Sequence, residues 1–230
     1  GASWKGDEGF FYSKYDQPKE GSVLSGMTDT HKVYFHKLGT SPTKDELIIG
    51  GEDFKRRYMG IGVSDDERYL ILSASNATNG NELYIQDLKN KTGFIPVQLG
   101  YDYNTDVVET IGNTIYVITD KDAPNQKLQK FDINNPKIWT DVIPETENVL
   151  SISTGGGFLF AKYMKDAVSM VQQYDFDGKL IREIALPGKG TAGGFGGKKE
   201  QKDLYYSFSN YTTPGSTYKI NVDSGKSELY

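Results

Sequence analysis

A pattern of strands and turns recurs five times along this chain, and this repetition constrains the fold more than any other feature. Each copy holds an aromatic-rich strand that follows a tight polar turn. The central strands of the five copies cover residues 10–13, 69–73, 114–118, 158–161 and 204–208. Their spacing of roughly 45 residues is typical of the blades of a β-propeller. Because such units bury one face only by stacking on a neighbour, the pattern predicts a single all-β domain.

The repeat divides the chain into five units of four strands each. Their approximate bounds are 1–53, 54–101, 102–147, 148–190 and 191–230. Pro96 in the fourth strand of the second unit indicates an edge strand, because proline cannot donate to a sheet ladder. The dipeptide Asp177-Gly178 predicts a hairpin turn in the fourth unit. No helical periodicity of useful length appears, so the expected domain is one partial propeller over residues 1–230.

Composition excludes several classes of partner. The chain has 230 residues, enough for one large all-β domain. Its net charge is −5, and no stripe of lysine and arginine stands out, so we expect neither nucleic acid nor an anionic membrane as a partner. The short basic runs 55–57 and 198–199 are interpreted as solvated turns. No window approaches the roughly 18 apolar residues of a membrane span.

The absence of cysteine removes disulfides, thiolate metal sites and cysteine nucleophiles from consideration. It does not set the compartment, which stays open between cytoplasm and periplasm. The chain also lacks the G-x-S-x-G motif of a serine nucleophile. The glycine-rich run 193–197 is not followed by a helix, so it is interpreted as an inner strand with close neighbours rather than a phosphate-binding loop.

The titratable residues form no recognisable catalytic or metal-binding pattern. His31 and His36 lie five residues apart on or near one strand, outside any zinc motif. The adjacent acids in pairs 7–8 and 65–66 cannot flank a sugar bond from two sides, and they are interpreted as solvated turn carboxylates. We therefore assign no catalytic residue, no metal and no cofactor to this chain.

Several stretches resemble blades of the prolyl oligopeptidase family. They are WKGDEGFFYS at 4–13, HKVYFHKLGT at 31–40, YMG at 58–60, SDDERYL at 64–70, NELY at 81–84 and YSFSNYTTPGSTY at 206–218. Each stretch alone is moderately specific, whereas their order and spacing together are more specific. The likeness extends over essentially the whole chain.

The resemblance implies a seven-bladed propeller that caps an α/β-hydrolase domain. That family cleaves short peptides after proline with Ser, Asp and His residues that all lie in the hydrolase domain. The chain then holds about five of the seven blades and lacks the catalytic domain, so alone it is expected to be inactive. Its implied role is to gate access to the active site, and its implied partners are the hydrolase domain of the same protein and short proline-containing peptides.

The resemblance assigns three residues of this sequence to the family's substrate cavity. Met59 matches a position that lines the S3 side of the cavity, although a plain core role explains a methionine there equally well. Asn76 and Asn79 align near a loop that faces the active site from the propeller. In many members that loop carries an arginine, and Asn76 stands in its place here. Ordinary turn chemistry is the competing explanation for both asparagines.

Two other functions remain open at the level of sequence. Five units could close into a five-bladed glycoside hydrolase, for which Asp106 and Glu109 are the only acids near an inner strand that attract attention. The chain could also be a non-catalytic propeller that binds proteins or peptides, although the Trp-Asp motif of that large class is missing. The first and last of the five units would expose strand edges and apolar faces, and we expect self-association or partial ring closure of this chain.

Overall fold

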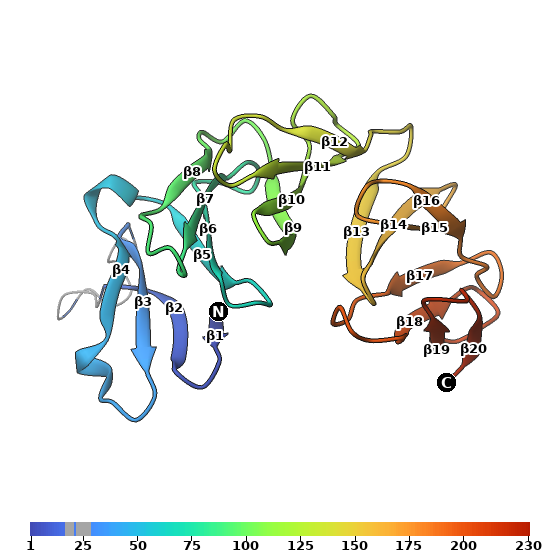
Figure 1. The fold of residues 1–230 in the computed structure, drawn as a ribbon, viewed down its shortest axis with the longest axis horizontal. Helices are drawn as coiled ribbons and strands as arrows, with labels where there is room; N and C mark the ends of the chain where they lie inside the picture. Colours follow the sequence, from blue (N-terminus) through green and yellow to red (C-terminus); the bar gives the residue numbers. More distant parts are fainter. Residues whose placement is uncertain (17–20, 22–28) are drawn as a thin grey trace. The chain divides into compact units, whose positions relative to one another are not determined.

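Each sheet of the computed structural model is an antiparallel meander whose strands pair in chain order (Figure 1). The structure describes residues 1–16, 21 and 29–230. In this part of the chain there are five sheets of four strands and two single-turn 3₁₀ helices, η1 (Pro42–Lys44) and η2 (Glu52–Phe54). This confirms the all-β class and the four-stranded units expected from the repeat.

The first two sheets contain strands β1 to β8. Their bounds are β1 (Ala2–Lys5), β2 (Gly9–Tyr15), β3 (His31–Lys37) and β4 (Glu46–Gly50), then β5 (Tyr58–Val63), β6 (Tyr69–Ser75), β7 (Glu82–Asp87) and β8 (Ile95–Gln98). Strand β8 pairs only with β7, so Pro96 lies in an edge strand as expected.

The other three sheets contain strands β9 to β20. The third has β9 (Thr105–Ile111), β10 (Thr114–Thr119), β11 (Lys127–Asp132) and β12 (Thr140–Ile143), and the fourth has β13 (Leu150–Gly155), β14 (Phe158–Lys165), β15 (Val168–Tyr174) and β16 (Leu180–Glu183). The fifth has β17 (Thr191–Gly194), β18 (Asp203–Ser209), β19 (Ser216–Asn221) and β20 (Ser227–Leu229). Gly178 turns the chain between β15 and β16 with a φ of 84°, which confirms the hairpin.

The chain divides into two compact units, residues 1–106 and 107–230. In the first unit, β5 packs across β1, β2 and β3. The layer between the two sheets is built from the buried residues Val33, Met59, Leu72 and Ala74. Successive residues of a strand point to opposite faces, so the alternating apolar positions of β6 supply two of these four.

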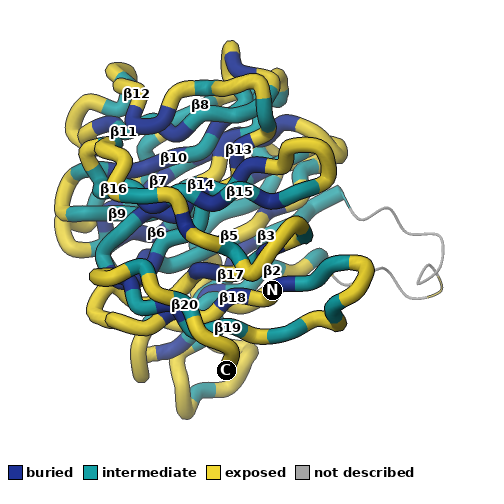
Figure 2. The backbone as a smooth tube through the Cα atoms, turned by 90° about the vertical axis from the view of Figure 1, so that its right-hand side faces the viewer, coloured by how far each residue is buried: buried dark blue, intermediate teal, exposed yellow. Residues whose placement is uncertain are grey.

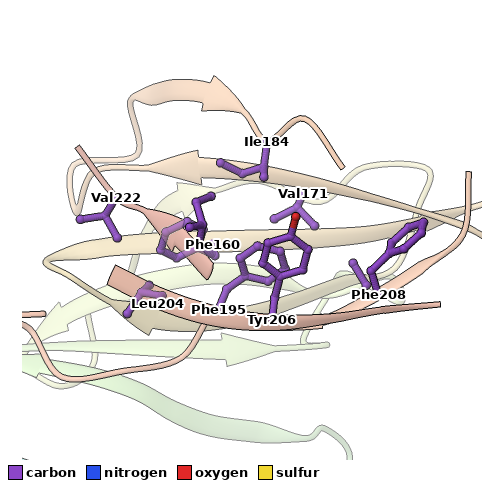
Figure 3. Packing of buried hydrophobic residues seen from close by; sticks show 10 residues of the cluster. Phe160, Val171, Ile184, Phe195, Leu204, Tyr206, Phe208 and Val222 are labelled. Carbon is purple, nitrogen blue, oxygen red and sulfur yellow. The ribbon is translucent and has the colours of Figure 1, made fainter. Parts of the chain in front are cut away.

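The second unit has two buried layers of its own. The larger one joins the fourth and fifth sheets through stacked aromatic rings, among them Phe160, Phe195 and Tyr206 (Figure 3). Burial follows the strands, while turns and loops are mostly exposed (Figure 2). Along β18, for example, Leu204, Tyr206 and Phe208 are buried and the residues between them are exposed. No helix in the described part of the chain is long and apolar enough to cross a membrane.

The glycine-rich run differs from its expected form. Only its first two residues belong to a strand, because β17 ends at Gly194. Phe195 then turns inward with a φ of 67° and is 1% exposed. The expectation of close neighbours is confirmed, since a Cβ on Gly197 would lie 2.3 Å from the Gln201 side chain.

Candidate functional site

The first unit has one end at which its longer connections gather. Register pairs Met59 of β5 with Ala74 of β6, and Ala74 with Glu82 of β7. The start of β5, the end of β6 and the start of β7 therefore lie together. His31 brings the start of β3 to the same place, because its Nδ1 accepts the Met59 N–H at 2.8 Å. We call this region, with the β6–β7 loop of residues 76–80, the loop end.

The β6–β7 loop presents four exposed residues, 76–79, on a fixed base. Gly80 closes the loop with a φ of 78°, and a Cβ at this position would lie 1.8 Å from the Tyr101 carbonyl oxygen. Only glycine allows so close a backbone approach. The Gly80 N–H also donates to Asn104 Oδ1 at 2.9 Å. Asn76 and Asn79 thus lie on a loop whose end has little freedom.

A buried polar network lies directly below the loop. The Asn81 side chain donates to the Thr105 carbonyl oxygen and accepts from the Thr105 N–H, both at 2.9 Å. Gln98 Nε2 donates to the Asn81 carbonyl oxygen at 2.8 Å, and Thr105 Oγ1 donates to Gln98 Oε1 at 2.6 Å. Because each group satisfies another, the network is rigid and specifies one loop conformation.

The interpretation of residues 55–57 as a solvated turn is wrong for Arg57, whose side chain is paired. Its guanidinium lies 3.2 Å from Glu82 Oε2, donates to the Tyr101 hydroxyl and lies over the Phe54 ring at 5.1 Å. Glu82 Oε2 also accepts from the Tyr84 hydroxyl at 3.1 Å. Burial, and then the charge of Glu82, raise the pKa of Tyr84 to about 12. The other two residues of the run are exposed.

The three residues assigned to the substrate cavity lie at the loop end but in different environments. Met59 is 3% exposed and belongs to the buried layer between the first two sheets. Asn76 and Asn79 are exposed on the loop. In this chain Met59 is thus a core residue, whereas the side chains of the two asparagines lie at the surface.

The acids considered for a glycosidase do not form a pair. Asp106 and Glu109 lie three apart on β9, so their side chains point to opposite faces of the strand. Glu109 Oε1 accepts the N–H of its own neighbour Thr110 at 2.9 Å. Two carboxylates on opposite faces cannot flank one glycosidic bond.

The two histidines do not lie close together either. His31 faces β5, while His36 lies on the other face of β3, with its Nδ1 2.7 Å from Asp45 Oδ1. Within residues 1–16, 21 and 29–230, no group of three or more metal-ligating side chains lies together.

Sequence reasoning missed the partners that shape the loop end. Arg57 and Glu82 are 25 residues apart, and Asn81 and Thr105 are 24 apart. Neither pair has a local motif. The one available hint was the polar pair Asn81 and Glu82 at the start of a strand, where a buried polar residue needs partners.

A family model described as the N-terminal beta-propeller domain of prolyl oligopeptidase matches residues 1–230. The prolyl endopeptidases of Elizabethkingia meningoseptica and Elizabethkingia miricola are 65% and 62% identical to the whole chain. The chain spans 33% of the length of each of these relatives.

Solved structures agree with these matches. A prolyl endopeptidase structure, from work on inter-domain dynamics in catalysis and specificity, has a TM-score of 0.90 and 30% identity and covers 100% of this chain and 34% of that chain. Apo prolyl oligopeptidase B from Galerina marginata has a TM-score of 0.86 at 20% identity, over 99% of this chain and 33% of that one. This second likeness supports the fold alone.

Proposed function

The chain belongs to the prolyl oligopeptidase N-terminal beta-propeller family, and on this premise we propose that it is the gating part of a proline-specific serine oligopeptidase. The observation that carries the proposal is the family match over all 230 residues. The proposed partners are an α/β-hydrolase domain of the same protein, which supplies the catalytic triad, and short peptides that contain proline. The comparisons favour this function over the glycosidase and the non-catalytic binding propeller.

The proposed physical role is selection by size. A propeller that covers an active site leaves a narrow route, so short peptides enter and folded proteins do not. Closure of a lid over bound substrate also removes water and completes the catalytic arrangement. On this proposal the chain supplies access and peptide contacts, and it has no catalytic residue of its own.

The loop end is the part of the chain that we propose for peptide contact. Asn76 and Asn79 offer exposed carboxamides, which donate to and accept from a peptide backbone. Gly80, Asn81 and Gln98 hold the loop in one conformation, so little ordering is needed on binding. Met59 lies below and contributes by supporting the start of β5.

Kinetics of the full-length protein test this proposal. With a short proline-containing peptide, the double variant Asn76→Ala/Asn79→Ala should raise KM about fivefold or more, because each lost hydrogen bond weakens binding by about 1 kcal/mol. The value of kcat should change little, since neither residue takes part in the chemistry. The 230-residue chain alone should show no hydrolysis, and a folded protein substrate should resist the full-length enzyme.

Asp65→Ala is the matched control. Asp65 is also an exposed turn residue of the second sheet, but it lies in the β5–β6 turn at the opposite end. Its KM should equal that of the wild type. Equal kinetics for all three proteins would contradict a role of the loop end in peptide binding. A reading frame without a downstream G-x-S-x-G segment would contradict the peptidase itself.

A further inference from the structure

The hydrogen bond that the His31 ring accepts determines which of its two nitrogens carries the proton. His31 is the first residue of β3, and its Nδ1 lies 2.8 Å from the backbone nitrogen of Met59. A backbone N–H only donates, so Nδ1 must accept and carries no proton. The neutral ring therefore has its proton on Nε2. A titratable side chain of the first sheet thus holds the start of β5 in the second sheet.

The surroundings of His31 favour the neutral ring. The Tyr15 ring stacks on it with centroids 4.4 Å apart and an interplanar angle of 16°. Burial lowers the pKa of His31. No carboxylate contacts this ring in the described ranges of the chain.

Two charged side chains near His31 in the described part of the chain form ion pairs. Lys32, the next residue on β3, binds Asp16 at 2.7 Å. Arg57, ahead of β5, binds Glu82 at 3.2 Å. Asp29, two residues before His31, lies 3.8 Å from Lys55 Nζ.

His36 provides a contrast within the same strand. Its Nδ1 lies 2.7 Å from Asp45 Oδ1, and a carboxylate oxygen only accepts, so Nδ1 of His36 donates. A second proton on His36 leaves this hydrogen bond in place. A second proton on His31 would occupy the atom that accepts the Met59 N–H.

We propose that His31 is a proton-sensitive positioning residue whose neutral form holds the start of β5 against the first sheet and whose protonation releases it. The charged ring has a donor at both nitrogens, so the Met59 N–H loses its acceptor. Met59 and Arg57 lie at this strand end, and the β6–β7 loop rests beside them. The release itself is independent of the proposed function, whereas any consequence for peptide binding rests on it.

The direction of the pH effect follows from linkage. The released state has a pKa near the ordinary value of about 6.5, and the held state has a lower one. The hydrogen bond to Met59 is therefore fully present above about pH 6.5 and is lost as pH falls through the lower pKa.

Hydrogen exchange on the full-length protein tests the proposal. The Met59 amide is followed between about pH 8 and about pH 4.5, with correction for the intrinsic exchange rate. Its corrected exchange should rise by roughly tenfold for each pH unit that separates the pKa values of the held and released states. The Val63 amide is the internal control, because it also donates to a side chain of the first sheet, Ser3 Oγ at 2.9 Å, which does not titrate. An equal rise at Val63 would overturn the proposal.

Two variants test whether the pH response of the Met59 amide comes from His31 itself. His31→Asn keeps an acceptor near the Nδ1 position without titrating, so the pH response of the Met59 amide should disappear. His36→Asn is the matched control and should keep the response. A response that survives in His31→Asn would overturn the proposal.

A further measurement uses only the wild-type protein, so it does not depend on whether a variant folds. Imidazole ¹⁵N shifts of the wild type at about pH 8 should show Nδ1 of His31 unprotonated and Nε2 protonated. A proton on Nδ1 would overturn the proposal. Neither readout involves substrate, so their failure contradicts this inference alone, and failure of the peptide kinetics contradicts the proposed function alone.

Discussion

At the scale of single residues, the ion pair of Arg68 and Asp87 is among the most buried in the first unit. Arg68 Nη2 lies 2.7 Å from Asp87 Oδ2, and Asp87 also accepts from the backbone and side chain of Asn90, both at 2.9 Å. Asp87 is 2% exposed. Burial alone would raise the pKa of Asp87, but the hydrogen bonds from Arg68 and Asn90 outweigh it and hold the pKa below its ordinary value. The pair joins the β5–β6 turn to the end of β7.

We expect Asp87→Asn to lower the free energy of unfolding by about 3 kcal/mol near neutral pH, because Arg68 keeps a buried charge without its partner. The depressed pKa means that this stabilisation is present above the ordinary value of about 3.9 and is lost as pH falls through the lower pKa. Urea unfolding of both proteins near pH 7 and near pH 3 measures the difference, which should shrink in acid.

Asp223→Asn serves as the control for this experiment. Asp223 pairs with Lys202 at 3.1 Å, but both side chains are more than half exposed. Its removal should change stability by less than about 1 kcal/mol. If Asp87→Asn were equally mild, the buried pair would not stabilise the fold as described.

At the scale of elements, the fifth sheet is attached to the fourth by a stack of aromatic rings (Figure 3). Phe195 lies between Tyr206 at 4.5 Å and Phe160 at 5.6 Å. Its φ of 67° is unusual for a bulky residue. Such a conformation persists only when the surrounding packing determines it. The end of β17 is therefore set by the layer between the sheets.

Phe195→Ala should lower the free energy of unfolding by about 3–5 kcal/mol, because it removes a buried ring and leaves a cavity. Leu180→Ala is the control, since Leu180 is 47% exposed on β16 of the same unit, and it should cost less than about 1 kcal/mol. Denaturant unfolding of both variants measures this contrast. Similar losses in the two variants would show that the aromatic stack is not what joins these sheets.

At the scale of the whole molecule, the first sheet carries an aromatic face directed away from β5. Register places Trp4 beside Phe10, and Tyr12 beside Tyr34, which is paired with Leu47. Trp4 is 59% exposed and Leu47 is 51% exposed. Contiguous exposed apolar surface of this kind favours association.

We expect the 230-residue chain to associate at micromolar concentrations, so light scattering should report a mass above the 25.6 kDa of one chain. Trp4→Lys should shift the mass toward the monomer, because it places a charge within the aromatic face. Ile138→Lys is the control, since Ile138 is 62% exposed in a loop outside that face, and it should leave the mass unchanged. A strict monomer across the whole concentration range would contradict this prediction.

The sequence by itself determined the all-β class, the four-stranded units, the edge position of Pro96, the turn at Gly178 and the family. These features follow from local periods, turn chemistry and the order of motifs, which are all written along the chain. It could not place Arg57 beside Glu82, pair Asn81 with Thr105, or join His31 to Met59 28 residues away. Only the tertiary structure decided these contacts. The Asn81–Thr105 and His31–Met59 contacts depend on how one sheet packs on the next, and the Arg57–Glu82 contact joins two segments of the second sheet that are distant in sequence. The alternation along a strand divides its residues between two faces, but the packing of the folded chain decides which residues each face contacts.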